Sequence, residues 1–318
     1  MDERLINKRL RREFRIPGWL LVAYYALMNV MVMIGMFADM LKQNFEAMAR
    51  GNMMPEMDMD ALLGNAWGYI CAVVVAMLFL FMWKDRSFWK EQVFARKKKM
   101  GFGRFVILLC ACMAIQFVNS FWVEGLELFM NLFDKSILET LESVSGSSDT
   151  FSMFLYASIV APITEELIFR GYVQGALSRY GKKFAILCSG LFFGIFHGNL
   201  IQTPYAFFVG LLLGYVAAEY HIGWAIGIHM FNNLVLADLL TRATAGLSLE
   251  LTSAINLILF GLATVVTGIV LIVKRKAVAA YLWEEWLDRR CLKWFLINSG
   301  TIVLFLIMST NSLLVLLA

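Results

Sequence analysis

Nine apolar segments follow one another along this chain of 318 residues, and they leave it few ways to fold. A helix needs about 20 residues to cross the hydrocarbon layer of a bilayer, and most of the segments approach that length. They lie at residues 18–38, 62–83, 104–123, 151–177, 184–200, 204–219, 223–241, 254–273 and 295–317. Because lipid offers no partners to backbone polar groups, only helices and closed barrels span it. The pattern therefore predicts an all-α fold, a polytopic helical membrane protein with about eight or nine transmembrane helices.

Composition points the same way. Hydrophobic residues make up 60% of the chain and the mean hydropathy is +0.69, which excludes an ordinary soluble domain with a charged surface. The basic N-terminus precedes an apolar run that is too long for a signal peptide, so we expect a retained anchor. The five cysteines imply no disulfide framework. We expect an integral, multi-pass protein of a bacterial plasma membrane, surrounded by the lipid bilayer and without a nucleic-acid partner.

Basic residues gather on one side of the predicted topology. With a cytoplasmic N-terminus and nine crossings, the cytoplasmic segments hold 24 of the 28 Lys and Arg residues, Arg170 included. The other four lie in the opposite loops, which are acidic at 39–60 and 124–149. Because cytoplasmic loops of membrane proteins carry an excess of Lys and Arg, the distribution favours a cytoplasmic N-terminus.

Three regions are expected along the chain. Residues 1–149 form N-terminal membrane-anchoring helices and loops, and residues 150–241 form the candidate catalytic core. Residues 242–318 form C-terminal membrane helices and include an aromatic, charged stretch at 277–294 that is predicted to lie in the inner interface.

Two adjacent carboxylates in the core indicate a role beyond anchoring the chain in the membrane. Glu165 and Glu166 lie inside an apolar segment, where a single charge costs at least about 2.5–3.5 kcal/mol. Glu166 and Arg170 are four residues apart and are predicted to pair on one helix face. Glu165 is rotated by about 100° from Glu166, so it cannot share that arginine and remains available for chemistry. A purely structural ion pair is the competing interpretation of Glu166 and Arg170.

Two of the three histidines also fall inside apolar segments. His197 follows Phe193 at a spacing of four, and His229 precedes Asn233 at the same spacing, so each pair shares a helix face. His221 lies in a short polar turn, where an interfacial role suffices. A lone intramembrane histidine is often only an interhelical hydrogen bonder. Two histidines beside an available glutamate and an asparagine favour catalysis.

Small residues at helical spacing predict close contacts between these segments. They are Gly190, Gly194 and Gly198, then Gly210 and Gly214, then Gly223 and Gly227. Close packing of the three segments would bring His197 and His229 near Glu165.

The three motifs together resemble the CPBP family of CAAX proteases and bacteriocin-processing enzymes, also called the Abi family. The family pattern is Glu-Glu-x-x-x-Arg, then Phe-x-x-x-His, then His-x-x-x-Asn or Asp. It is matched here by Glu165-Glu166-Leu-Ile-Phe-Arg170, by Phe193-Gly-Ile-Phe-His197 and by His229-Met-Phe-Asn-Asn233. The resemblance covers about residues 150–240.

The resemblance implies an intramembrane endopeptidase similar to the type II CAAX prenyl endopeptidases, cutting a membrane-associated, lipidated or secreted peptide. Its catalytic residues would be Glu165, His197, His229 and Asn233: the first two would activate water and the last two would stabilise the oxyanion. Glu166 and Arg170 would orient the catalytic helix.

Two further questions stay open in the sequence. Members of the family are commonly described as metalloproteases. A divalent metal such as zinc would be held by Glu165, His197 and His229. A metal-free glutamate mechanism is favoured over this metal mechanism. The alternative functions are a non-catalytic protein of bacteriocin immunity or regulation, which binds a partner through the same cavity, and a transporter that relays protons. The oligomeric state is not predicted.

Overall fold

The computed structural model describes residues 3–52, 57–95, 97–138, 150–284 and 287–317, and within these residues every regular element is a helix. The predicted all-α fold is therefore confirmed. Seven helices of the described part are long and apolar enough to cross a membrane. The predicted segments 184–200 and 204–219 form helices of 15 and 17 residues, which are too short to count among the seven. The total number of crossings stays a prediction.

The helices of the N-terminal region are α1 (Glu3–Ala49), α2 (Met59–Leu63), α3 (Trp67–Trp83), the π-helical η1 (Phe88–Val93) and α4 (Phe102–Asn131). The core contains α6 (Phe151–Leu155), η2 (Tyr156–Val160), α7 (Ala161–Glu166), η3 (Leu167–Val173), α8 (Gln174–Leu177), η4 (Ser178–Tyr180), α9 (Lys182–Phe196), α10 (Thr203–Glu219), α11 (Ile222–Met230), η5 (Phe231–Leu239) and α12 (Leu240–Thr244). The chain closes with α13 (Leu249–Val273), α14 (Arg275–Trp283), α15 (Arg289–Leu296) and α16 (Ser299–Leu317).

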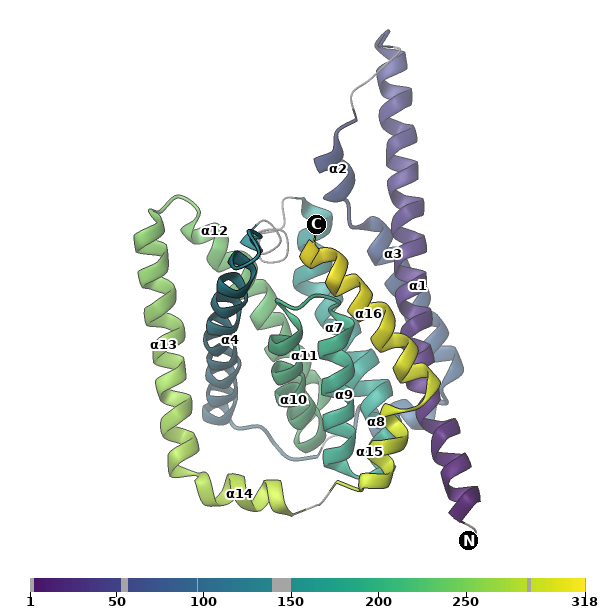
Figure 1. Cartoon of the computed structure of the whole chain (residues 1–318), viewed down its shortest axis with the longest axis vertical. Helices are drawn as coiled ribbons and strands as arrows, with labels where there is room; N and C mark the ends of the chain where they lie inside the picture. Colours follow the sequence, from purple (N-terminus) through teal and green to yellow (C-terminus); the bar gives the residue numbers. More distant parts are fainter. Residues whose placement is uncertain (1–2, 53–56, 96, 139–149, 285–286, 318) are drawn as a thin grey trace.

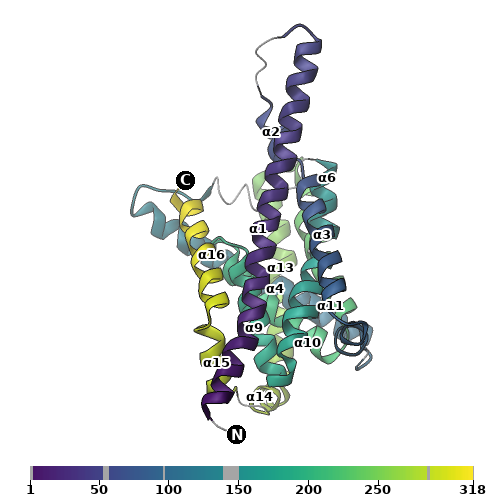
Figure 2. The ribbon, with the colours of Figure 1, turned by 90° about the vertical axis from the view of Figure 1, so that its right-hand side faces the viewer.

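The first helix is longer than the predicted segment 18–38. α1 has 47 residues and is about 70 Å long at 1.5 Å per residue, more than twice the thickness of a bilayer core. Its far end rises beyond the other helices, as Figure 2 shows. The polar residues at both ends of α1 continue the helix, and hydropathy alone could not reveal that.

Loops that were predicted to be cytoplasmic meet at one end of the bundle, where Figure 1 places the N-terminus, α14 and α15. There Arg290 donates to Glu3 at 2.6 Å, and the Trp294 indole donates to Asn7 at 2.9 Å. This end of the bundle, called the basic end below, gathers the described Lys and Arg residues of the N-terminus, of 84–104, of 179–183 and of 274–293.

Arg170 corrects the count of cytoplasmic charges, because it is buried inside the protein and not in a loop. Which membrane face the basic end occupies stays a prediction. The interfacial stretch 277–294 is divided between α14 and α15, which are both at the basic end.

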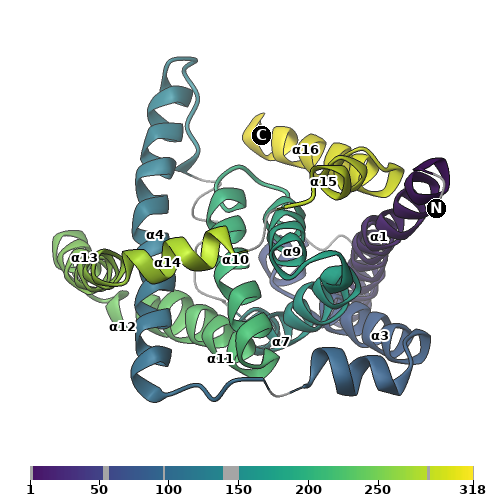
Figure 3. The ribbon, with the colours of Figure 1, turned by 90° about the horizontal axis from the view of Figure 1, so that it is seen from below.

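α10 lies in the middle of the core, between α4 on one side and α9 on the other, as the view along the bundle in Figure 3 shows. Its glycines explain how closely α9 approaches. A Cβ added to Gly210 would lie 3.0 Å from the Cα of Gly190, and one added to Gly194 would lie 2.8 Å from Phe207. The predicted glycine contact is thus confirmed for these two helices. At Gly227 no atom lies within 4 Å of an added Cβ, so that glycine allows no close contact.

We expect Gly210→Ala to lower the thermal stability of the protein, because the new methyl group would push apart the two backbones that position the site. Overpacking of this kind typically costs about 1–3 kcal/mol. The measurement is the melting temperature of detergent-purified protein. Gly227→Ala is the matched control and should leave it unchanged or slightly higher, since alanine is the better helix former. Equal melting temperatures for the two variants would contradict the close packing at Gly210.

Candidate active site

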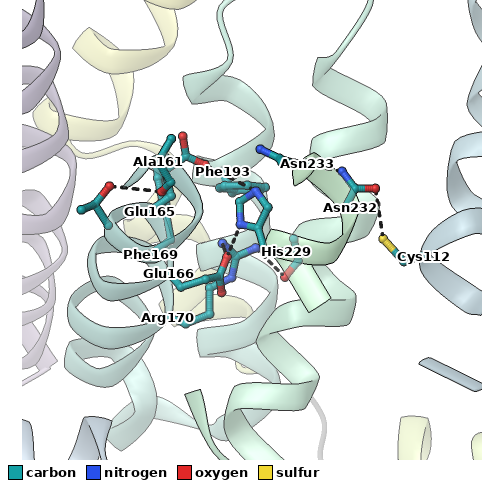
Figure 4. Close-up of polar contacts among 12 residues, drawn as sticks. Cys112, Ala161, Glu165, Glu166, Phe169, Arg170, Phe193, His229, Asn232 and Asn233 are labelled. Atoms are coloured by element: carbon teal, nitrogen blue, oxygen red, sulfur yellow. Dashed lines mark hydrogen bonds and ion pairs between the residues drawn. The ribbon is translucent and has the colours of Figure 1, made fainter. Parts of the chain in front are cut away.

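The predicted site residues come from three neighbouring parts of the core. Glu165 and Glu166 end α7, and Arg170 follows in η3. His197 directly follows α9, and His229 lies in the last turn of α11. Asn233 lies in η5. Figure 4 shows the side chains of Glu165, Glu166 and His229 converging between these helices.

Glu166 connects Arg170 to His229 through hydrogen bonds. One of its oxygens, Oε1, accepts from Nη1 of Arg170 at 2.8 Å and from Nδ1 of His229 at 2.9 Å. The side chains of Glu166 and Arg170 are both fully buried. Arg170 also donates to the carbonyl of Gly210 at 3.3 Å and lies 4.1 Å from the ring centre of Phe193. The predicted pair is present, and its extension to His229 was missed in the sequence.

Glu165 lies at the edge of the His229 ring opposite to the edge that Glu166 holds. Its side chain keeps 22% of its surface exposed, and its Oε2 lies 3.9 Å from Nε2 of His229. That separation is too long for a hydrogen bond. Because Nδ1 of His229 is held by Glu166, it is Nε2 that is presented to Glu165. The two glutamates therefore contact opposite edges of one imidazole ring.

His197 is joined to His229 through Phe193. The Phe193 ring lies edge-on to both imidazoles, with ring centres 4.9 Å from His197 and 5.7 Å from His229. Nδ1 of His197 lies 2.8 Å from the Phe193 carbonyl, which can only accept, so Nδ1 carries the proton. In the neutral ring, Nε2 of His197 is consequently the nitrogen with a lone pair. Gly198 then turns the chain at a φ of +63°, a conformation that favours glycine.

Asn233 belongs to a chain of amides. Its Nδ2 donates to the Ala157 carbonyl at 3.0 Å, and its Oδ1 accepts from Asn232 at 3.0 Å. Asn232 in turn accepts from the Tyr205 hydroxyl at 2.6 Å and from Cys112 at 3.7 Å. Asn232 and Tyr205 were missed in the sequence. Asn232 could have been recognised in the sequence as a second amide beside Asn233 in an apolar segment. No sequence feature distinguishes Tyr205 from other tyrosines.

A cavity of about 910 Å³ brings the predicted catalytic residues together. Its lining includes Glu165, His197, His229 and Asn233, and it also includes Asn232 and Tyr205. Glu166 and Arg170 lie behind this wall and do not line the cavity. The four residues predicted to be catalytic thus line the cavity and the two predicted to orient are buried behind it; their roles stay a prediction.

Two π-helical turns adjoin the site. η3 directly follows the two glutamates and η5 directly follows α11, so both motifs adjoin a turn wider than an α-helical one. Such turns are rare and occur frequently at functional sites. η5 contributes Asn232 and Asn233 to the cavity wall, whereas no residue of η3 lines it.

The side chains do not fit a metal site as they are arranged. Within the described residues, no group of three His, Cys, Asp or Glu side chains is placed to hold a metal ion. The set expected for zinc was Glu165, His197 and His229. As arranged, these three side chains do not form such a group.

Residues 147–235 match the family model described as "Type II CAAX prenyl endopeptidase Rce1-like". The matched stretch contains all three motifs, which confirms the resemblance drawn from them. No curated protein and no solved structure matches the chain.

We expect Arg170→Met to destabilise the protein strongly, because it would leave the Glu166 carboxylate buried without its cation. Breaking a buried pair on one side typically costs about 3–5 kcal/mol. The double variant Glu166→Gln/Arg170→Met leaves no buried charge and should recover part of the loss. The measurement is the free energy of unfolding in detergent.

Arg9→Met is the matched control for this experiment. Arg9 and Glu13 have the same spacing of four, but the Arg9 side chain is 59% exposed, so its loss should change the free energy of unfolding little. A similar, small loss for both arginines would show that the buried pair contributes no more than a surface pair.

Proposed function

We propose that this protein is an intramembrane endopeptidase, because residues 147–235 match the type II CAAX prenyl endopeptidase Rce1-like family model. The substrate is a membrane-associated, lipidated or secreted peptide, and the membrane is a bacterial plasma membrane. One observation supports this proposal most strongly. A partly exposed carboxylate, Glu165, stands 3.9 Å from His229 Nε2 on the wall of a cavity, while the neighbouring carboxylate is neutralised by a buried arginine.

In the proposed reaction, Glu165 and His197 remove a proton from the attacking water. The water oxygen bonds to the carbonyl carbon of the scissile peptide, and the carbonyl oxygen becomes negative. The lone pair on Nε2 of His197 and the Glu165 carboxylate are both able to accept that proton. Collapse of the tetrahedral intermediate breaks the C–N bond, and the proton passes to the leaving amine.

The oxyanion is stabilised by His229 and Asn233. Glu166 holds Nδ1 of His229, so a protonated ring would direct its Nε2–H into the cavity and would be stabilised by the carboxylate behind it. Asn233 has two amide hydrogens and gives one to the Ala157 carbonyl, which leaves the other for the substrate. The amide chain from Tyr205 through Asn232 fixes the orientation of this donor.

We expect Glu165→Gln to reduce cleavage by about 10²–10⁴-fold, the range contributed by a general base, with expression and folding unchanged. Peptide termini would be compared by mass spectrometry in cells that express the wild type or the variant at equal levels. Glu250→Gln is the control, because Glu250 is an exposed carboxylate at the start of α13. Identical termini for wild type and Glu165→Gln, with a phenotype that still depends on the protein, would favour a binding or immunity role.

We also expect proteolysis by the purified protein to survive prolonged treatment with a strong zinc chelator. The physical reason is that Glu165, His197 and His229 form no cluster able to hold a metal ion. The measurement is the cleavage rate before and after chelation, with a zinc endopeptidase treated in parallel. Loss of activity that added zinc restores would establish a metal mechanism and overturn the proposed glutamate mechanism.

A further inference from the structure

Among the described residues, the exposed side chains that line the cavity come from one end of the bundle. Its exposed lining residues mark the mouth, and they come from the second half of α4, from the segment after α4 and from the junction of η5 with α12. They are Ser120, Glu124, Leu128, Leu138, Ala237 and Thr241. Figure 1 places α12 at the end of the bundle opposite the N-terminus, α14 and α15. The mouth is thus on the far side from the basic end.

An apolar layer closes the cavity toward the basic end. Leu108 and Cys112 of α4 pack there against Leu213 and Val216 of α10 and against Ile228 of α11, and all five side chains are buried. Residues 102–115 of α4 do not line the cavity. This layer therefore separates the cavity from the basic end between α4, α10 and α11.

Below this layer, charged groups seal the basic end. Glu219 at the end of α10 pairs with Lys98 at 2.5 Å and also with Lys182. The backbone of Lys97 donates to the Tyr220 carbonyl at 3.1 Å. The loop before α4 is thus fastened across the end of α10. Because loops rich in Lys and Arg tend to face the cytoplasm, we infer that the sealed end is the cytoplasmic one and that the mouth is on the outer face.

The cavity wall is also electronegative. Its lining includes the carboxylates Glu124, Glu127, Glu165 and Asp238, and no Lys or Arg belongs to the lining among the described residues. Asp238 is paired with Arg242, and Glu127 accepts from the backbone N–H of Ile137, so both are engaged. Glu124 is exposed at the mouth. Complementary charge steers a partner and suppresses wrong ones, so this mouth favours a positively charged segment.

We propose that the site receives exported, cationic peptide segments on the outer face of the membrane. Cleavage of such peptides rests on the proposed protease function; the location of the mouth does not. Two experiments separate these parts, the first by chemical access to the mouth and the second by the products.

The first experiment uses single-cysteine variants in a background without the five native cysteines. Glu124→Cys reports on the mouth and Lys99→Cys, an exposed position of the basic end, is its counterpart. Intact cells would be treated with a membrane-impermeant maleimide. We expect Glu124→Cys to be labelled in intact cells and Lys99→Cys only after permeabilisation. Labelling of Glu124→Cys only after permeabilisation, or of both variants from the same side, would overturn the proposal whatever the enzyme does.

The second experiment identifies the substrates from their cleavage products. Peptide termini that depend on Glu165 would be located in their parent proteins by mass spectrometry. We expect them in exported segments with Lys or Arg within a few residues of the cut, and we expect Glu124→Gln to reduce the yield of these cationic products by up to about fivefold. Cuts in cytosolic segments, or cuts without nearby basic residues, would overturn the proposed substrate class.

The two failures can be told apart. If no terminus depends on Glu165 while Glu124→Cys is labelled from outside, then the protease function and the substrate class fail and the position of the mouth stands. If Glu165-dependent cuts occur and Glu124→Cys is reached only from inside, the protease function stands and the outward mouth fails.

Discussion

The site depends on one buried oxygen. Oε1 of Glu166 accepts from Arg170 and from His229, and Arg170 reaches on to the carbonyl of Gly210, so a single carboxylate joins α7, η3, α11 and α10. A buried pair of this kind need not add net stability, because the desolvation of both ions opposes their attraction. Its effect here is on geometry. It fixes which edge of His229 faces the cavity and leaves Glu165 as the carboxylate beside it.

The close contact of α9 with α10 serves the same geometry. Gly190 and Gly210 let the two backbones approach closely, and Phe193 of α9, which lies against Gly210, contacts His229 and the Arg170 guanidinium. Larger side chains at the two glycines would separate α9 from α10. Phe193 would then lose its place between the two imidazoles. Packing of small residues, which drives helix association in membranes, is therefore also what assembles the polar site.

Much of this arrangement could be predicted from the sequence, and the rest could not for identifiable reasons. Apolar runs reveal the helices because lipid and the protein interior both favour apolar residues. Polar residues within such runs are conspicuous because their burial costs free energy. The bond from His229 to Glu166 joins residues 63 apart, and no periodicity links them. Arg170 was counted with the cytoplasmic charges because composition cannot tell a buried cation from one in a loop. The π-helical turns have no sequence signal comparable to a proline or a cap.

The proposed hydrolysis requires a site that admits water without opening a path for ions across the membrane. The two halves of the core divide this task. Around Glu165 the wall is polar and reaches the mouth at Glu124, so the carboxylate keeps contact with solvent and avoids the full cost of burial. Toward the basic end, Leu108, Leu213 and Val216 form a buried apolar layer that closes this part of the bundle. A cavity that ends on such a layer is accessible from a single face, and that asymmetry makes the direction of substrate entry a property of the fold.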